Sequence, residues 1–155
     1  MRHVELLETP LTPYAWLGHF ESELAEKFGS GRFGAAAVFV GTMRDFNEGE
    51  SVSRLFLEHY PGMTEKQLQQ ISEQISNDVL HTAIVHRVGH IEPGQAIVIT
   101  AAWSAHRQAA FDACRQLIEA LKHEAPFWKQ EQRQTQGKKK AHWVQANTPL
   151  IQTDH

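Results

Sequence analysis

Residues 33–43 form an almost unbroken run of small and apolar side chains, Phe-Gly-Ala-Ala-Ala-Val-Phe-Val-Gly-Thr-Met. Such a run predicts a strand buried on both faces, because a strand with one face in water alternates apolar and polar residues. The chain has 155 residues, enough for one domain that buries a core without disulfides or metals. We therefore expect a single domain over residues 1–155, with a loose tail after about residue 149.

The spacing of apolar residues and the positions of Gly and Pro predict the other elements. The expected helices cover 13–28, begin at Thr64 with capping-box spacing to Gln67, and run from near Ser104 to before Pro126. The apolar faces of the second and third helices are expected to carry Leu68, Ile71, Ile75 and Val79, and Phe111, Cys114, Leu117, Ile118 and Leu121. The other expected strands run from Val52 towards Tyr60, over 82–91, over 95–103 and at Trp143–Val144, with a basic loop at Lys138–Lys140. Strand groups flanked by helices indicate an α+β domain.

Composition excludes several classes of function. The formal net charge is −3, so the chain has no overall basic field for nucleic acid. No segment has the character of a signal peptide or a membrane span, which predicts a soluble, cytoplasmic protein with no membrane partner. The single cysteine, Cys114, excludes an intramolecular disulfide, and its apolar helix face favours a place in the core. His86 and His90 share a strand face without a third ligand, so we expect no metal and no cofactor.

Two lysines, Lys122 and Lys129, flank a Pro-Phe-Trp corner and have apolar neighbours. Desolvation or a second cation lowers the pKa of a lysine, and such a lysine can act as a nucleophile or exchange protons. The alternative is a pair of surface lysines at the end of a helix, where cations complement the helix dipole. Spacing alone leaves both interpretations open.

A second basic group indicates an anion-binding site. His106 and Arg107 follow Ser104 at an expected helix start, where backbone amides attract anions and the guanidinium adds a planar fork. Arg44 ends the apolar run, where a long cation can reach the rim of a pocket. All three residues are equally compatible with exposed surface positions. The chain lacks a Ser-His-Asp order, a Walker loop and a dinucleotide glycine pattern.

Several longer motifs follow one another along the chain. They are Val38–Arg44, Leu57–Met63, His86–Gly89, Ser104–Arg107, Ala110–Phe111, Leu121–Lys122, Ala125–Lys129 and His142–Val144. In this order they resemble the family of molybdopterin synthase catalytic (large) subunits, over roughly residues 33–146.

The resemblance implies a fold, a reaction and partners. The fold is an α/β hammerhead-type domain with an additional antiparallel β-sheet subdomain. Two large subunits form a central homodimer, and a small ubiquitin-like subunit at each end completes a heterotetramer. The small subunit carries a thiocarboxylate on its C-terminal Gly-Gly tail, and its sulfur is transferred to cyclic pyranopterin monophosphate to make the dithiolene of molybdopterin.

The resemblance also assigns roles to residues of this chain. Lys122 matches the lysine at the end of the tail, and Lys129 matches its partner in acid–base and substrate chemistry. Arg44, His106 and Arg107 match the wall that binds the anionic substrate. Two other functions stay open at this point. One is a non-catalytic receptor for a ubiquitin-like tail, and the other is an anion-binding hydrolase or transferase.

Overall fold

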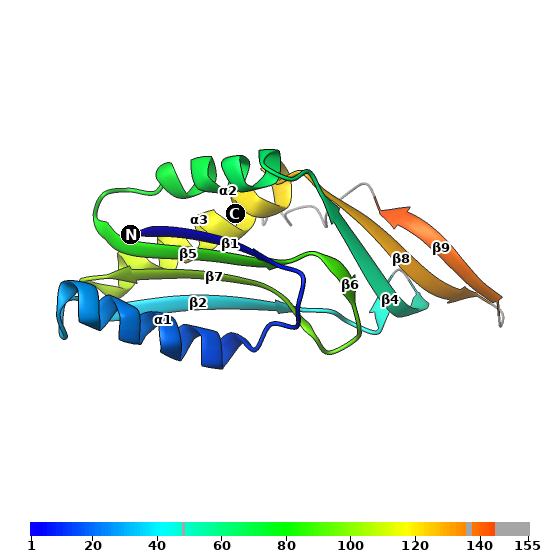
Figure 1. Ribbon diagram of the computed structural model, residues 1–155, viewed down its shortest axis with the longest axis horizontal. Helices are drawn as coiled ribbons and strands as arrows, with labels where there is room; N and C mark the ends of the chain where they lie inside the picture. Colours follow the sequence, from blue (N-terminus) through cyan, green and yellow to red (C-terminus); the bar gives the residue numbers. More distant parts are fainter. Residues whose placement is uncertain (48, 136–137, 145–155) are drawn as a thin grey trace, which may run out of the picture.

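The computed structural model describes residues 1–47, 49–135 and 138–144, with side chains described for 1–47, 49–133 and 141. A four-stranded sheet forms the larger part of the molecule (Figure 1). Its strands, in spatial order, are β1 (Arg2–Leu7), β5 (Val79–Arg87), β7 (Ala96–Ser104) and β2 (Ala35–Thr42). β1 runs parallel to β5 and the other neighbours are antiparallel. The mixture of helices with largely antiparallel strands confirms the α+β class.

Helices cover both faces of this sheet. On one face, α1 (Pro13–Phe28) packs Phe20 and Leu24 against Trp103, which is fully buried. On the other face lie α2 (Met63–Glu73) and α3 (Arg107–Glu124), which form the main core with Leu68, Ile71, Ile84, Ala102 and Leu117. Because each face is covered by apolar helix surface, the central strands β5 and β7 are buried almost throughout.

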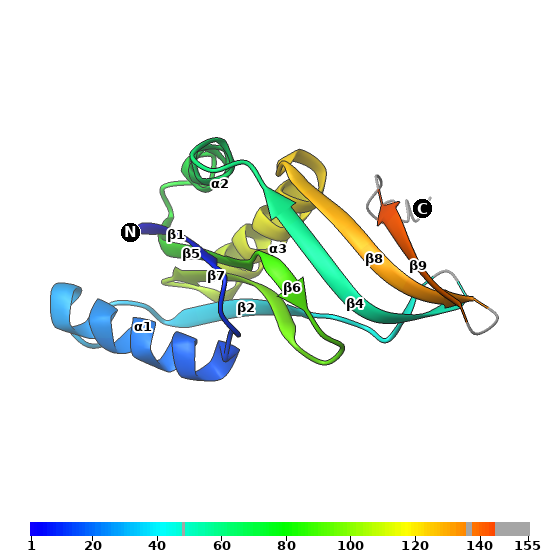
Figure 2. The same cartoon turned by 45° about the vertical axis from the view of Figure 1, so that its right-hand side comes forward.

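A second, antiparallel sheet extends away from the helices, as Figure 2 shows. It contains β3 (Phe46–Asn47), β4 (Glu50–His59), β8 (Phe127–Thr135) and β9 (Lys138–Val144), and β6 (Gly89–Ile91) also pairs with β4. The β4–β8 register places Leu57 opposite Lys129 and Leu55 opposite Glu131. This hairpin sheet agrees with the additional subdomain that the family resemblance implied.

The run at 33–43 is a strand, but the expectation that both of its faces are buried is wrong. β2 lies at an edge of the four-stranded sheet and pairs, among the described strands, with β7 alone. Its Val38 and Phe39 side chains are 43% and 37% exposed. The sequence pattern resembled a central strand because both faces are lined with apolar side chains, while the pattern carries no information about neighbours along the sheet.

The helix expected over 13–28 is confirmed, but the second and third helices differ from expectation. α2 ends at Glu73, and Val79 already belongs to β5; the apolar spacing continued because both elements bury the same core. The expected cap from Thr64 to Gln67 is wrong. Glu65 instead accepts a hydrogen bond from the Gly62 amide at 2.6 Å. In α3, Phe111 is 64% exposed and so lies outside the core.

The glutamine-rich and lysine-rich stretch after Lys129 is not a loop. Residues 127–135 and 138–144 form the β8–β9 hairpin, in which Gln132 pairs with Ala141. Its sequence has no apolar alternation because much of this sheet lies away from the helical core, so periodicity could not reveal it. The short strand expected at Trp143–Val144 is the end of β9. The tail after residue 149 lies outside the described residues.

Candidate functional site

A pocket of about 830 Å³ lies where the two sheets meet. Its walls are the end of β2 with the segment that follows, the C-terminal turn of α3, and the first half of β8. The apolar part of its lining includes Phe39, Val52, Leu55, Ile97, Val98, Ile118, Leu121 and Phe127. The charged part of its lining consists of Arg44, Lys122, Lys129 and Glu131. A cavity with apolar walls and a few convergent polar groups is the usual form of a small-molecule site, and the three cations of this lining favour an anionic ligand.

The end of α3 brings the two lysines to this pocket. The Ala125 amide donates to the Leu121 carbonyl at 3.1 Å and ends the helix, since Pro126 cannot continue it. Lys122 is therefore in the last helical turn, where it is exposed, and Lys129 lies in β8, where it is partly buried. Buried Leu121 packs into the core beside Lys122. The chain turns after α3 and continues as β8, so that Lys122 and Lys129 both line the pocket.

Lys129 has the electrostatic setting of a reactive lysine. Burial is the largest cause that lowers its pKa, and the positive charge of Lys122 lowers it further, while the carboxylate of Glu131 acts in the opposite direction. A lowered pKa increases the neutral fraction of an amine at a given pH, so Lys129 exchanges a proton more readily than a solvated lysine. The sequence predicted desolvation by apolar neighbours for both lysines; it is found for Lys129, and it is wrong for Lys122, which is exposed at the end of α3.

His86 forms part of the pocket and was not assigned to it by the sequence analysis. Its ring stacks on Phe127 with centroids 4.0 Å apart and planes 14° apart, and Nδ1 lies 2.6 Å from the Arg87 carbonyl oxygen. A carbonyl can only accept, so Nδ1 carries the hydrogen. Burial, the largest cause, together with the charge of Lys129, lowers the pKa of His86 to about 4. His86 is therefore a neutral imidazole near pH 7. Nothing in the sequence around His86 and Arg87 indicated that this ring lines the pocket.

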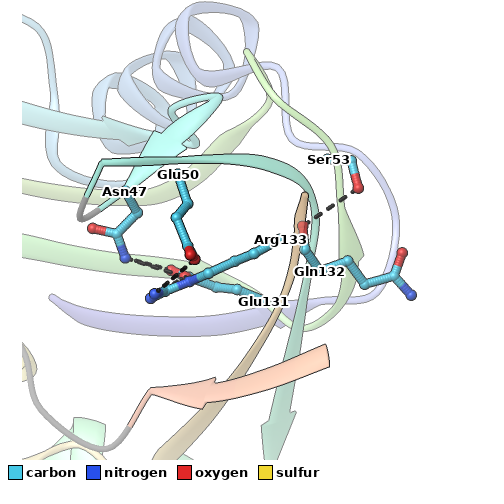
Figure 3. Close-up of polar contacts among 6 residues, drawn as sticks. All are labelled: Asn47, Glu50, Ser53, Glu131, Gln132 and Arg133. Atoms are coloured by element: carbon cyan, nitrogen blue, oxygen red, sulfur yellow. Dashed lines mark hydrogen bonds and ion pairs between the residues drawn. The ribbon is translucent and has the colours of Figure 1, made fainter. Parts of the chain in front are cut away.

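A buried ionic cluster follows Lys129 along β8 (Figure 3). Asn47 donates to both carboxylate oxygens of Glu131 at 2.9 and 3.1 Å. Arg133 Nε donates to Glu131 Oε2 at 2.8 Å, and Arg133 Nη1 lies 3.5 Å from Glu50 Oε2. Glu131 and Arg133 are buried, at 9% and 7% exposure. This cluster could not be predicted from the sequence, because its members come from three strands and share no short motif.

The five residues predicted from the sequence do not all meet in one chain. Arg44, Lys122 and Lys129 line the same pocket. His106 and Arg107 are exposed at the start of α3, and Lys122 lies in its last turn. Fifteen residues of α-helix separate Arg107 from Lys122, which is about 22 Å at about 1.5 Å per residue. This chain therefore holds the lysines and the His106–Arg107 pair at opposite ends of one helix.

Other candidates for chemistry have structural explanations. Cys114 is buried, its Sγ lies 3.7 Å from Thr100 Oγ1, and burial raises its thiol pKa, so it belongs to the core as expected. The expectation that His86 and His90 share a strand face is wrong, because His86 belongs to β5 and His90 to β6. No group of three or more potential metal ligands occurs among the described residues. Within that same part of the chain, no helix is long and apolar enough to cross a bilayer. The side chains of Lys138–Lys140 lie outside the described residues.

This chain is similar to known proteins of one family. The family model described as "MoaE protein" matches residues 19–124. A Pseudomonas aeruginosa protein named "Molybdopterin synthase catalytic subunit" is 53% identical over 100 residues, covering 63% of this chain and 67% of the relative. The structure of the molybdopterin biosynthesis MoaE protein from Burkholderia ambifaria MC40-6 has a TM-score of 0.73 and 36% identity, covering 93% of this chain and 89% of that one.

A more distant structure shares the fold. It comes from a protein–protein complex of subunits 1 and 2 of molybdopterin-converting factor from Helicobacter pylori 26695. Its TM-score is 0.69 at 22% identity, and the match covers 88% of this chain and 87% of that chain.

Proposed function

This chain belongs to the MoaE protein family, the catalytic subunits of molybdopterin synthase, and from that premise we propose the reaction that its pocket performs. The proposed reaction transfers sulfur from the thiocarboxylated C-terminus of a small ubiquitin-like subunit to cyclic pyranopterin monophosphate. The observation that carries the proposal is the meeting of Lys122, Lys129 and Arg44 in one pocket of about 830 Å³. Both the thiocarboxylate and the phosphate are anions, so they match these cations.

The two lysines have different tasks in this proposal. Lys122 is exposed in the last turn of α3, so its ammonium can meet an incoming tail and hold the reacting thiocarboxylate. Lys129 is partly buried and has a lowered pKa, which suits a group that gives and takes protons during the transfer. Arg44, in the exposed segment after β2, suits the phosphate because its guanidinium is a planar, permanently charged donor.

The sulfur comes from a partner in this proposal. Cys114, the one cysteine of the chain, is buried against Thr100 with a raised thiol pKa, so it is poorly suited to carry sulfur. A pocket of about 830 Å³ is large enough for a narrow peptide end together with a small ligand. The Helicobacter complex, which contains two subunits of molybdopterin-converting factor, supports a protein partner for this chain.

We further propose a homodimer in which each copy completes the pocket of the other. The edge strand β2 exposes Val38 and Phe39, and α3, which packs against β2, exposes Phe111. Among the described strands the outer edge of β2 has no neighbour, and an apolar edge of this kind favours a second strand. An antiparallel, two-fold pairing of β2 centred between Val38 and Phe39 sets Ala35 of one copy opposite Thr42 of the other. Ala35 pairs with Ser104, close to His106, and Thr42 adjoins the pocket.

This pairing would bring His106 and Arg107 of the second copy to the pocket that Arg44, Lys122 and Lys129 line. It accounts for a basic pair at a helix start, which is otherwise unfavourable for the helix dipole. The catalytic unit in this proposal is therefore a heterotetramer, with a central dimer of this chain and a small subunit at each end.

Product formation tests the function directly. The protein is incubated with a thiocarboxylated small subunit and cyclic pyranopterin monophosphate, and the dithiolene product is followed by mass spectrometry. We expect Lys122→Ala to abolish product while the variant still binds the tail, measured separately by calorimetry. Full activity in Lys122→Ala refutes the assignment. Absence of pterin turnover by the wild type, with tail binding lost in both lysine variants, would identify a non-catalytic receptor instead.

A further inference from the structure

Glu131 lines the pocket, and its carboxylate is held in place by several polar contacts. It accepts hydrogen bonds from Asn47 Nδ2 and from Arg133 Nε, and Arg133 Nη2 also lies 2.8 Å from its Oε2 atom. Arg133 in turn forms an ion pair with Glu50. These residues come from β3, β4 and β8, as Figure 3 shows, so three strands fix the position of one carboxylate.

A buried cluster of this kind is costly unless its position is useful. Charged side chains lose hydration when they are buried, and their mutual attraction offsets that loss only with good geometry. Apolar residues of similar size would serve the stability of the sheet equally well. The cluster therefore suggests a requirement that apolar packing cannot meet, namely a negative charge at a defined place in the pocket.

Lys129 and Arg133 are the two ionisable neighbours of Glu131 on the same face of β8, one on each side of it. Residues i and i+2 of a strand point to one face, so Lys129 and Glu131 both face the pocket, and both line it. The other ionisable groups at the pocket are Lys122 from α3, His86 from β5 and Arg44 after β2. Glu131 is the only carboxylate among the described lining residues. The side chains of β9 opposite Lys129 and Glu131 lie outside the described part of the chain.

We propose that Asn47 and Arg133 are positioning residues, which hold Glu131 as the fixed counter-charge of Lys129 and so determine how readily Lys129 gives up its proton. This inference rests on the proposed function for its consequence in catalysis, while the electrostatic coupling belongs to the pocket itself. Glu131 opposes the burial and the Lys122 charge, both of which lower the pKa of Lys129. Arg133, in direct contact with Glu131, limits that opposing effect because it neutralises part of the carboxylate charge.

Two substitutions within one ion pair therefore have opposite effects. Glu131→Gln removes the counter-charge, so Lys129 loses its proton at a lower pH than in the wild type. Arg133→Gln removes a cation and leaves the Glu131 charge less compensated, so Lys129 keeps its proton to a higher pH. A purely structural role predicts damage in the same direction for both, because each change breaks the same contact.

The experiment measures the titration of Lys129 directly. The full-length protein is labelled with ¹³C at lysine Cε, the Lys129 signal is assigned with Lys129→Arg, and its shift is followed against pH. We expect the midpoint to fall on the order of one pH unit in Glu131→Gln and to rise in Arg133→Gln, as for charges several ångströms apart in a partly buried site. With sulfur transfer as a second readout, the lysine limb of the pH–rate profile should move in the same directions.

Three control variants separate charge from position. Gln132→Glu adds a carboxylate on the same strand, but Gln132 is exposed and projects away from the cluster in Figure 3, so the midpoint should stay unchanged. Arg133→Lys keeps the positive charge and should retain a midpoint near that of the wild type. Asn47→Ala changes no charge, and we expect it to lower kcat severalfold with little change in tail binding, since Glu131 is less firmly held.

The outcomes are distinguishable from those of the proposed function. A shift in the same direction in both charge variants, or no shift in either, overturns the inference even if sulfur transfer is confirmed. Opposite shifts support it even if the protein fails to transfer sulfur, because the lysine titration needs no substrate. If Arg133→Gln does not fold, as circular dichroism would show, Glu131→Gln compared with Gln132→Glu still decides whether Glu131 acts on Lys129.

Discussion

The proposed dimer can be tested by distributing two substitutions over two copies. Lys122→Ala and Arg107→Ala each remove one cation, and about 22 Å of α3 separates the two positions within a chain. If a pocket takes Lys122 from one copy and Arg107 from the other, a heterodimer of the two single variants has one pocket that retains both cations. The second pocket of that heterodimer lacks both.

This arrangement fixes the magnitude of the effect. The heterodimer with one substitution on each copy should show about half of wild-type activity per dimer, because one of its two symmetric sites is intact. A heterodimer of a wild-type copy and a copy with both substitutions should be nearly inactive, since each of its pockets lacks one cation. If instead each pocket used its own chain's Arg107, these two results would be exchanged.

The assay requires pure heterodimers. The two variants are co-expressed with different affinity tags and purified on both tags in sequence, and product is measured at saturating thiocarboxylated small subunit. Each single-variant homodimer provides the background activity. Activity in the doubly substituted/wild-type heterodimer equal to about half of the wild type would refute the shared pocket. A protein that stays monomeric in sedimentation would refute it earlier.

Three further predictions concern stability. The pKa of His86 is lowered from 6.5 to about 4, so the unfolded chain binds this proton as the pH falls below 6.5 while the folded chain does not. The stabilisation is thus present above pH 6.5 and is lost towards pH 4, by about 3 kcal/mol at most, and urea unfolding of the wild type should show a pH dependence that His86→Gln flattens. Gly34→Ala would push a Cβ atom into the backbone oxygen of Ala105, so we expect a loss of about 1–3 kcal/mol in thermal unfolding. In Gly18→Ala, where the new methyl meets open space within α1, a gain of about 0.5–1 kcal/mol is expected instead, and a loss there would contradict the account.

Local pattern predicted the elements that bury an apolar face. The helix at 13–28 and the α3 helix ending before Pro126 follow from residues within one or two turns of each other. The strand at 33–43 was found, while its place at the sheet edge was not, because apolar side chains above and below say nothing of the neighbouring strand. The β8–β9 hairpin was not predicted, because its polar sequence shows no apolar alternation.

The candidate site was likewise predicted only where its residues are close in sequence. Lys122 and Lys129 could be identified because the helix end, the proline and both lysines lie within nine residues of sequence. The neighbours that set their chemistry come from remote segments. His86 lies in β5 and Asn47 in β3, and only the packing of the two sheets brings them to the pocket.

The sequence by itself determined the fold class, the family and the pair of lysines, since these depend on local order and on motifs along the chain. Tertiary structure decided which charges meet. Glu131 faces Lys129 because both lie on one face of β8, and Arg133 and Asn47 hold it through contacts between strands. His106 and Arg107 lie at the far end of α3 because a helix is rigid and extends about 1.5 Å per residue. Electrostatic interactions depend on distance in space, and distance along the sequence predicts them only within one element.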